Sequence, residues 1–309
     1  MRFLVTGSRG MIGSHLMRRL SKEAVLGIDQ VNADADDYLR ADVNDFDELY
    51  RAFRQFGPDL VIHMAGEVGR LNGEQYPRRM LRTNVLGTYN VLKLCMDYSC
   101  RLINFSTSEV YGEAFDDSVV DESARLQAFG TTNVYAASKL FGEALVRHYV
   151  ENYELKAVTV RPFMVYGEGE EIRKTRSAIN NFVANALAGT PLTVHKDTLR
   201  AWCYVSDFLD GLSLLFDREV QGYQAFNIGS EQYTTALETA ELVCEVAGAS
   251  RGLIRLVDPP KVFSSPIKRA SIARMKAMGY SPKVSLREGV GRVVEWQRSG
   301  MQRSRNPLP

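Results

Sequence analysis

Residues 2–16 read RFLVTGSRGMIGSHL, an apolar run followed by a loop with three evenly spaced glycines and then a helical pattern. The stretch predicts a strand, a tight turn and a helix in immediate succession. Gly7 permits the tight turn, Gly10 lets backbone approach a bound group, and Gly13 allows close packing of the helix. Such a unit is typical of the start of a parallel α/β sheet.

The same loop predicts a dinucleotide site. Free N–H groups and the positive end of the helix dipole, at Met11 and Ile12, suit a pyrophosphate. Asp29 ends the next apolar run, AVLGID, where a carboxylate can accept hydrogen bonds from the adenosine ribose. The alternative is an Asp that serves only a turn or a helix cap. A carboxylate would repel a 2′-phosphate, which favours NAD over NADP. Further cofactor contacts are expected from Asp42, Val43, Met64, Ala65 and Gly66.

Strand-like and helical stretches alternate as far as about Arg161. The continuous apolar character of the strands predicts a parallel sheet covered on both faces. We therefore expect an α/β fold, a Rossmann-type doubly wound parallel sheet with a smaller C-terminal substrate-binding lobe. The NAD-binding domain is predicted over residues 1–162, with its last strands contributed from about 201–228, and the lobe mainly over 163–309. Helices are expected at Thr83–Tyr98 and Tyr135–Asn152, and a strand at Lys156–Gly167.

Composition narrows the class of protein. The 309 residues are 45% hydrophobic and 24% charged, and the formal charge of +1 gives no electrostatic reason to expect nucleic acid or a membrane surface. No apolar run approaches the ~18 residues of a membrane span, and no signal peptide is evident, so a cytoplasmic location is expected. Four cysteines without CxxC spacing predict reduced, buried thiols, and the four scattered histidines suggest no metal site.

Tyr135 and Lys139, in NVYAASKLFGE, lie four residues apart and therefore on one face of the predicted helix. An ammonium beside a phenol stabilises the phenolate, so the tyrosine can take a hydroxyl proton near neutral pH. Such pairs also arise by chance on amphipathic helices. The dinucleotide loop upstream favours the catalytic interpretation.

Several motifs together resemble the extended short-chain dehydrogenase/reductases, in the group of nucleotide-sugar epimerases, dehydratases and decarboxylases. They run in the family's order and read TGSRGMIGSHL, VIHMAGEV, LRTNVLGTYNVL, NFSTSEVYGE, YAASK, RPFMVYGEG and NALAGTPLTV…RAWCYVSDFLDGL. The resemblance implies oxidation of a sugar hydroxyl at C4 by NAD, with later return of the hydride. It gives Tyr135 the role of base and Thr107 that of binding the C4 oxygen. It gives Lys139 the roles of lowering the tyrosine pKa and holding the nicotinamide ribose, so that Tyr135 and Lys139 are also cofactor contacts. It also implies a homodimer.

Ser108 and Glu109, in STSEVYG, distinguish the branches of the resembled group. Epimerases of the group typically carry small residues two places after the catalytic Ser/Thr, whereas dehydratases carry Glu there, and UDP-glucuronate decarboxylases also read Thr-Ser-Glu. A 4-ketone makes the C5 hydrogen acidic, and Glu109 could remove it while water leaves C6. The loop HMAGEVGRLNG lacks the Ala-Ser-Pro run that decarboxylases of the group place near the substrate carboxylate, so we predict an NAD-dependent nucleotide-sugar lyase of the 4,6-dehydratase type. An NDP-uronate decarboxylase, a 4-epimerase and a non-catalytic NAD-binding sensor are the alternatives, in that order.

Substrate contacts are expected from the loop after VIHMAG and from the C-terminal half. Guanidinium groups match diphosphate oxygens, and the full predicted set is Glu67, Arg70, Asn181, Arg200 and Arg269. Each could instead be a solvated side chain without such a role. Met164 and Glu168 depart from the group's pattern, which has Asn and Pro at these places, and this suggests an unusual substrate or product.

Overall fold

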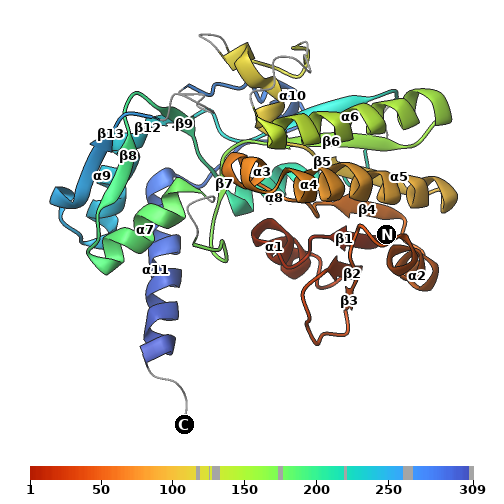
Figure 1. Cartoon of the computed structure of the whole chain (residues 1–309), viewed down its shortest axis with the longest axis horizontal. Coiled ribbons are helices and arrows are strands. Elements are labelled where there is room, and N and C mark those ends of the chain that lie inside the picture. Colours follow the sequence, from red (N-terminus) through yellow and green to blue (C-terminus); the bar gives the residue numbers. More distant parts are fainter. Residues whose placement is uncertain are drawn as a thin grey trace.

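The centre of the molecule is a seven-stranded, entirely parallel sheet in the order β11-β6-β5-β4-β1-β2-β3 (Figure 1). The structure, a computed structural model, describes residues 1–115, 119–124, 126, 133–172, 177–218, 221–259 and 267–305. The strands of the sheet are β1 (Arg2–Thr6), β2 (Ala24–Asp29), β3 (Tyr38–Arg40), β4 (Leu60–His63), β5 (Arg101–Phe105), β6 (Ala157–Pro162) and β11 (Gln224–Ile228).

Both faces of this sheet are buried. Along β1, Phe3 and Val5 point into one core and Leu4 into a second core on the opposite face, as strand alternation requires. The two cores are covered by α1 (Met11–Arg19) and α8 (Val205–Ser213) on the first side, and by α2 (Phe46–Phe56), α5 (Thr88–Asp97) and α6 (Val134–Tyr153) on the second. The predicted doubly wound parallel sheet is thus confirmed.

The C-terminal half adds a helical layer and short strand pairs beside the sheet, on the left of Figure 1. Its helices are α7 (Ala178–Ala188), α9 (Ala236–Ala247), α10 (Ala273–Lys276) and α11 (Leu286–Arg305). The strand pairs join β7 (Val165–Tyr166) to β10 (Cys203–Tyr204), β9 (Leu199–Ala201) to β12 (Tyr233–Thr235), and β8 (Leu192–His195) to β13 (Ile254–Val257). The same half also supplies β11, which pairs with β6 at the edge of the main sheet.

Three local features differ from the sequence prediction. The single strand expected at Lys156–Gly167 is wrong, because Met164 adopts a left-handed φ of 45° that separates β6 from β7. The helix expected at Thr83–Tyr98 begins as a π-helix, η1 (Arg82–Gly87), where the Thr88 hydroxyl donates to the Asn84 carbonyl at 2.8 Å. The short strand β3 was not predicted.

The remaining connecting elements are α3 (Arg70–Gln75), α4 (Pro77–Leu81) and the 3₁₀ segments η2 (Ser108–Phe115) and η4 (Arg251–Leu253). All four cysteines are free and buried, as predicted. Among the described residues, no helix is long and apolar enough to cross a membrane.

Candidate functional site

The glycine loop between β1 and α1 is packed so closely that side chains are excluded. Gly7 has a φ of 73°, and a β-carbon on it would lie 2.7 Å from the Ala65 nitrogen. A β-carbon on Gly13 would overlap the Gly7 carbonyl oxygen. Gly10 is the N-cap of α1, and within the described part of the chain no side chain caps the first N–H groups of that helix. The loop therefore fits a phosphate group held by backbone N–H donors.

The predicted cofactor residues surround this loop at the carboxyl ends of the strands. The Asp29 carboxylate accepts from the Arg9 backbone nitrogen at 3.0 Å and from that of Gln30 at 2.8 Å, and its lone pairs leave room for ribose hydroxyls. Met64, Ala65 and Gly66 form the loop after β4; the Ala65 nitrogen donates to the Thr6 hydroxyl at 3.2 Å. These features fit NAD.

Asp42 and Val43 follow β3, one strand further out. The Asp42 carboxylate accepts from the Asn44 backbone at 2.9 Å, which fixes the turn, and Val43 is buried. A β-carbon on Gly87 would lie 2.8 Å from a Val43 methyl carbon, so η1 packs directly on this turn. The contact of Asp42 and Val43 with the adenine of the cofactor stays a prediction.

Tyr135 and Lys139 lie near the start of α6, where the Asn133 side chain caps the helix by accepting from the Ala136 nitrogen at 2.9 Å. Both side chains are buried. The Lys139 ammonium donates to the Phe105 carbonyl at 2.9 Å, which ties α6 to the end of β5 just before Thr107. Burial lowers the pKa of Lys139 to about 8, against the opposing charge of Glu143.

The cofactor loop approaches this ammonium directly. A β-carbon on Gly66 would lie 3.0 Å from Lys139 Nζ and 2.9 Å from the Asn84 side-chain oxygen. The Asn84 amide binds both backbone groups of Glu67, accepting from its nitrogen at 2.8 Å and donating to its carbonyl at 2.9 Å. Asn84, which the sequence analysis did not select, thus positions the loop that follows β4.

Thr107 and Ser108 are buried where β5 runs into η2. The Thr107 hydroxyl accepts from the Glu109 nitrogen at 3.3 Å. Because η2 packs on α6 and Lys139 bonds to Phe105, the predicted catalytic residues of the two segments share one region.

Glu109 lies in a cluster of positive charges. Its carboxylate accepts from Arg70 Nε at 2.7 Å, and a second Arg70 nitrogen completes a two-point ion pair. Lys268 contacts the other carboxylate oxygen through Nζ. Burial raises the pKa of Glu109, but the charges of Lys268 and Arg70 outweigh it and lower the pKa to about 2. Glu109 is therefore ionised at neutral pH.

Arg200, on β9, adds a third positive charge near this carboxylate. Its Nη1 donates to the Leu199 carbonyl at 2.7 Å. Burial lowers the pKa of Arg200 to about 10. The negative charge of Glu109 raises this pKa in part, and the positive charge of Arg70 lowers it further. Two of the predicted substrate residues, Arg70 and Arg200, thus lie beside Glu109.

The other predicted substrate residues lie differently. Glu67 accepts from Arg79 Nε at 2.5 Å and from the Asn72 amide at 2.9 Å. Asn181, on α7, donates to the Ser177 carbonyl at 2.9 Å. Arg269 contributes its backbone carbonyl to Val120 at 3.1 Å, while its neighbour Lys268 is the residue that reaches Glu109. Lys268 directly precedes Arg269 in the sequence, but only the arginine was predicted as a substrate contact.

Comparison with known proteins agrees with this arrangement. The model of the NAD dependent epimerase/dehydratase family matches residues 3–229. The chain belongs to this family. UDP-glucuronic acid decarboxylase 5 of Arabidopsis thaliana is 31% identical, covering 96% of this chain and 89% of the relative. The dTDP-glucose 4,6-dehydratase of Salmonella typhimurium is 27% identical, covering 98% and 94%.

Solved structures of family members share the whole fold. The UDP-glucose 4-epimerase of Thermus thermophilus, in complex with NAD, superimposes with a TM-score of 0.87 at 28% identity and covers 96% of this chain and 99% of that one. DesIV, a dTDP-glucose 4,6-dehydratase from Streptomyces venezuelae with NAD bound, gives 0.87 at 28% identity over 98% of both chains. The predicted fold, family and cofactor, NAD, are confirmed. The relatives carry out three different reactions.

Proposed function

We propose that the chain is a nucleotide-sugar lyase of the 4,6-dehydratase type. The observation that carries the proposal is the position of Glu109, an ionised carboxylate fixed by Arg70 and Lys268 two residues after Thr107. A simple epimerase does not need a carboxylate there. Decarboxylases of the group share Thr-Ser-Glu, and the dehydratase is favoured over them because the loop HMAGEVGRLNG lacks their Ala-Ser-Pro run. The substrate is an NDP-hexose, in keeping with the dehydratase relatives.

The first half of the reaction is acid–base chemistry at C4. Tyr135, held as the phenolate by the Lys139 ammonium, takes the proton of the C4 hydroxyl and becomes the neutral phenol, while Thr107 binds the C4 oxygen. Bound NAD supplies a reversible acceptor for the C4 hydride, so the reaction has no net redox change. The glycine loop and Asp29 hold its phosphate and ribose groups.

The second half takes place at C5 and C6. The C4 ketone makes the C5 proton acidic, because the carbanion delocalises into the carbonyl group. Glu109 accepts that proton, and the C6 hydroxyl takes up a proton and departs as water, which leaves a C5=C6 double bond. The returned hydride adds at C6 and a proton from solvent at C5. Ser108, next to Glu109 and buried, can donate a hydrogen bond to the leaving oxygen. Asn181 and Arg269 are proposed contacts of the nucleotide diphosphate, and Glu67 of the sugar.

A second candidate is decarboxylation of an NDP-uronate. Among the described residues, three basic side chains, Arg70, Arg200 and Lys268, surround the Glu109 carboxylate. The positive excess would attract a C6 carboxylate, and UDP-glucuronic acid decarboxylase 5 is 31% identical to this chain, against 27% for the dTDP-glucose 4,6-dehydratase of Salmonella typhimurium.

Incubation with NDP-hexoses and NDP-uronates in deuterated water distinguishes the dehydratase from the decarboxylase. A dehydratase incorporates solvent deuterium at C5 and loses water, whereas a decarboxylase releases carbon dioxide from the uronate. We expect Glu109→Gln to reduce C5 exchange by about 100-fold or more, because an amide cannot accept the proton. Glu151→Gln, an exposed change on α6, is the control. Release of carbon dioxide, or full turnover by Glu109→Gln, would contradict the dehydratase assignment.

A further inference from the structure

Lys268 is a buried lysine brought to the site from a distant part of the sequence. Its side chain is 4% exposed and its Nζ contacts Oε1 of Glu109, 159 residues earlier in the chain. Removing an ammonium from water is costly, so a buried lysine requires a partner or a function. Glu109 is that partner, but Arg70 already neutralises this carboxylate with two donors.

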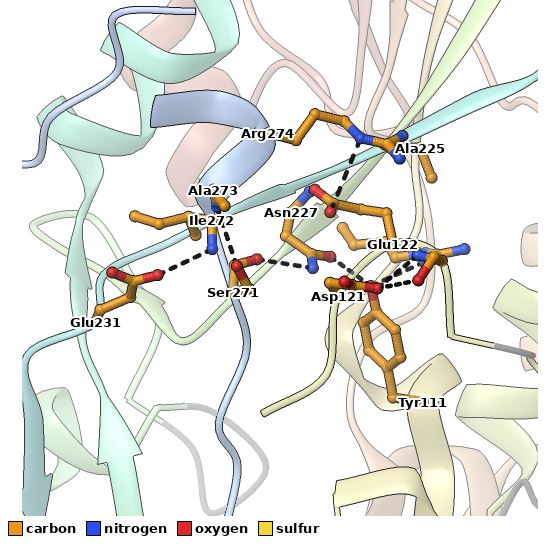
Figure 2. A network of polar contacts seen from close by, with 12 residues as sticks. Tyr111, Asp121, Glu122, Ala225, Asn227, Glu231, Ser271, Ile272, Ala273 and Arg274 are labelled. Atoms are coloured by element: carbon orange, nitrogen blue, oxygen red, sulfur yellow. Dashed lines mark hydrogen bonds and ion pairs between the residues drawn. The ribbon is translucent and has the colours of Figure 1, made fainter. Parts of the chain in front are cut away.

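The segment that carries Lys268 is held firmly. Ile267 forms a bridge with Leu199, and Ala270 forms one with Val120. Asn227, on β11, accepts from the Tyr111 hydroxyl at 2.7 Å and donates to the Ser271 carbonyl at 3.1 Å (Figure 2). Tyr111 lies two residues after Glu109.

Further contacts fix both ends of this network. The buried Arg161 donates to the Tyr111 hydroxyl at 2.9 Å while it is paired with Glu143. At the other end, the Ile272 nitrogen donates to Glu231 at 3.2 Å, as Figure 2 also shows. The segments that carry Glu109 and Lys268 are thus joined by one network of hydrogen bonds.

The proposed dehydration lacks a strong acid for the leaving group. Hydroxide is a poor leaving group, so the C6 oxygen needs a proton as the C–O bond breaks. Serine is not among the side chains that ionise in proteins, and arginine keeps its protons at neutral pH. Of the described side chains that contact Glu109, Lys268 is therefore the one that can lose a proton near neutral pH. Burial lowers its pKa to about 7; the charge of Glu109 opposes this, and those of Arg70 and Arg200 assist it.

We propose that Lys268 is the catalytic acid for departure of the C6 hydroxyl, an assignment that rests on the proposed dehydratase function. Glu109 accepts the C5 proton, and the C5–H electron pair moves into the C4 carbonyl group. The enolate electron pair then forms the C5=C6 double bond as the C6–O bond breaks with its electron pair on oxygen, and that oxygen takes a proton from the Lys268 ammonium and leaves as water. The proton on Glu109 passes to the neutral lysine through their direct contact, which restores both groups.

The test uses the full-length enzyme with two substrates, an NDP-glucose and its 6-deoxy-6-fluoro analogue. Fluoride departs as an anion and needs no proton. Lys268→Arg keeps the positive charge next to Glu109 but cannot act as an acid. We expect it to dehydrate NDP-glucose at least about 100-fold more slowly than wild type, while C5 deuterium incorporation and fluoride release stay within about tenfold.

Lys276→Arg, an exposed change on α10, is the matched control and should retain all three activities. Circular dichroism and thermal melting check that each variant folds. If Lys268→Arg dehydrated NDP-glucose at the wild-type rate, the assignment would be overturned. If the variant lost fluoride release and dehydration to the same extent, Lys268 would be a positioning residue and the assignment would also fail. A wild-type enzyme that neither exchanges C5 nor eliminates with any NDP-hexose would contradict the proposed function itself, and the assignment with it.

Discussion

His63 shows how a single buried residue links stability to pH. Its ring nitrogens lie 2.8 Å from the Thr6 hydroxyl and 3.1 Å from that of Thr88, and the side chain is 1% exposed. Burial, assisted by the charge of Lys139, lowers the pKa of His63 to about 3. The folded chain therefore leaves this histidine neutral where the unfolded chain, with a pKa near 6.5, protonates it.

The consequence is a loss of stability in mild acid. Unfolding takes up a proton as the pH falls below about 6.5, so this contribution to the free energy of unfolding is full above that pH and declines toward pH 3. Between pH 7 and 5 we expect wild type to lose about 2 kcal/mol more than His63→Gln, from about 1.4 kcal/mol per pH unit. Urea denaturation at both pH values measures the difference. His148→Gln, at an exposed site on α6, should keep the wild-type acid sensitivity; equal slopes for wild type and His63→Gln would refute the linkage.

Individual residues also mark where sequence reasoning succeeded and where it stopped. Glu109 and Arg70 were both selected from local motifs, but nothing in their spacing indicated that they form an ion pair. Arg269 was selected in place of Lys268. Neighbouring residues of an extended segment point to opposite faces, and the bridges at Ile267 and Ala270 that orient this segment depend on strands remote in sequence.

At the scale of elements, the glycine loop makes a demand that can be tested. A methyl group at Gly13 would overlap the Gly7 carbonyl oxygen, so Gly13→Ala should displace the start of α1. We expect this variant to lose about 1–3 kcal/mol of stability and most of its NAD affinity, measured by urea denaturation and by fluorescence titration with NAD.

A second glycine in a helix provides the control. Gly291, on α11, has open space where a β-carbon would be placed, so Gly291→Ala should gain about 0.5–1 kcal/mol from helix propensity and bind NAD as wild type does. Unchanged NAD affinity in Gly13→Ala would rule out the glycine loop as the phosphate site.

The elements themselves followed well from periodicity, because both faces of the sheet are buried and the strands therefore read as continuous apolar runs. The interruption of the expected strand at Met164, between β6 and β7, did not follow from periodicity. Its left-handed backbone conformation is one that Asn tolerates better than most residues. The family's Asn at this place, noted as a departure in the sequence, thus also meets a backbone requirement, which hydrophobic pattern alone does not reveal.

At the scale of the whole molecule, several large apolar side chains remain exposed on one set of adjoining helices. Leu86 on η1 is 56% exposed, Tyr89 on α5 is 42%, and Phe141 and Tyr153 on α6 are each 55%. η1, α5 and α6 pack against one another. Figure 1 shows α5 and α6 on the right, at the opposite end of the view from β13 and α9. Exposed apolar clusters of this kind mark association surfaces, and a second copy of this chain is the occupant that the resemblance to family members implies.

We therefore expect the protein to sediment as a dimer at micromolar concentration. The double variant Leu86→Glu, Phe141→Glu should sediment as a monomer, because association would bury two carboxylates without partners in an apolar contact. Leu256→Glu, which charges an equally exposed apolar site on β13, should stay dimeric. Analytical ultracentrifugation at several concentrations distinguishes the three proteins. A wild-type monomer, or a double variant that still dimerises, would show that this helical surface is not the interface.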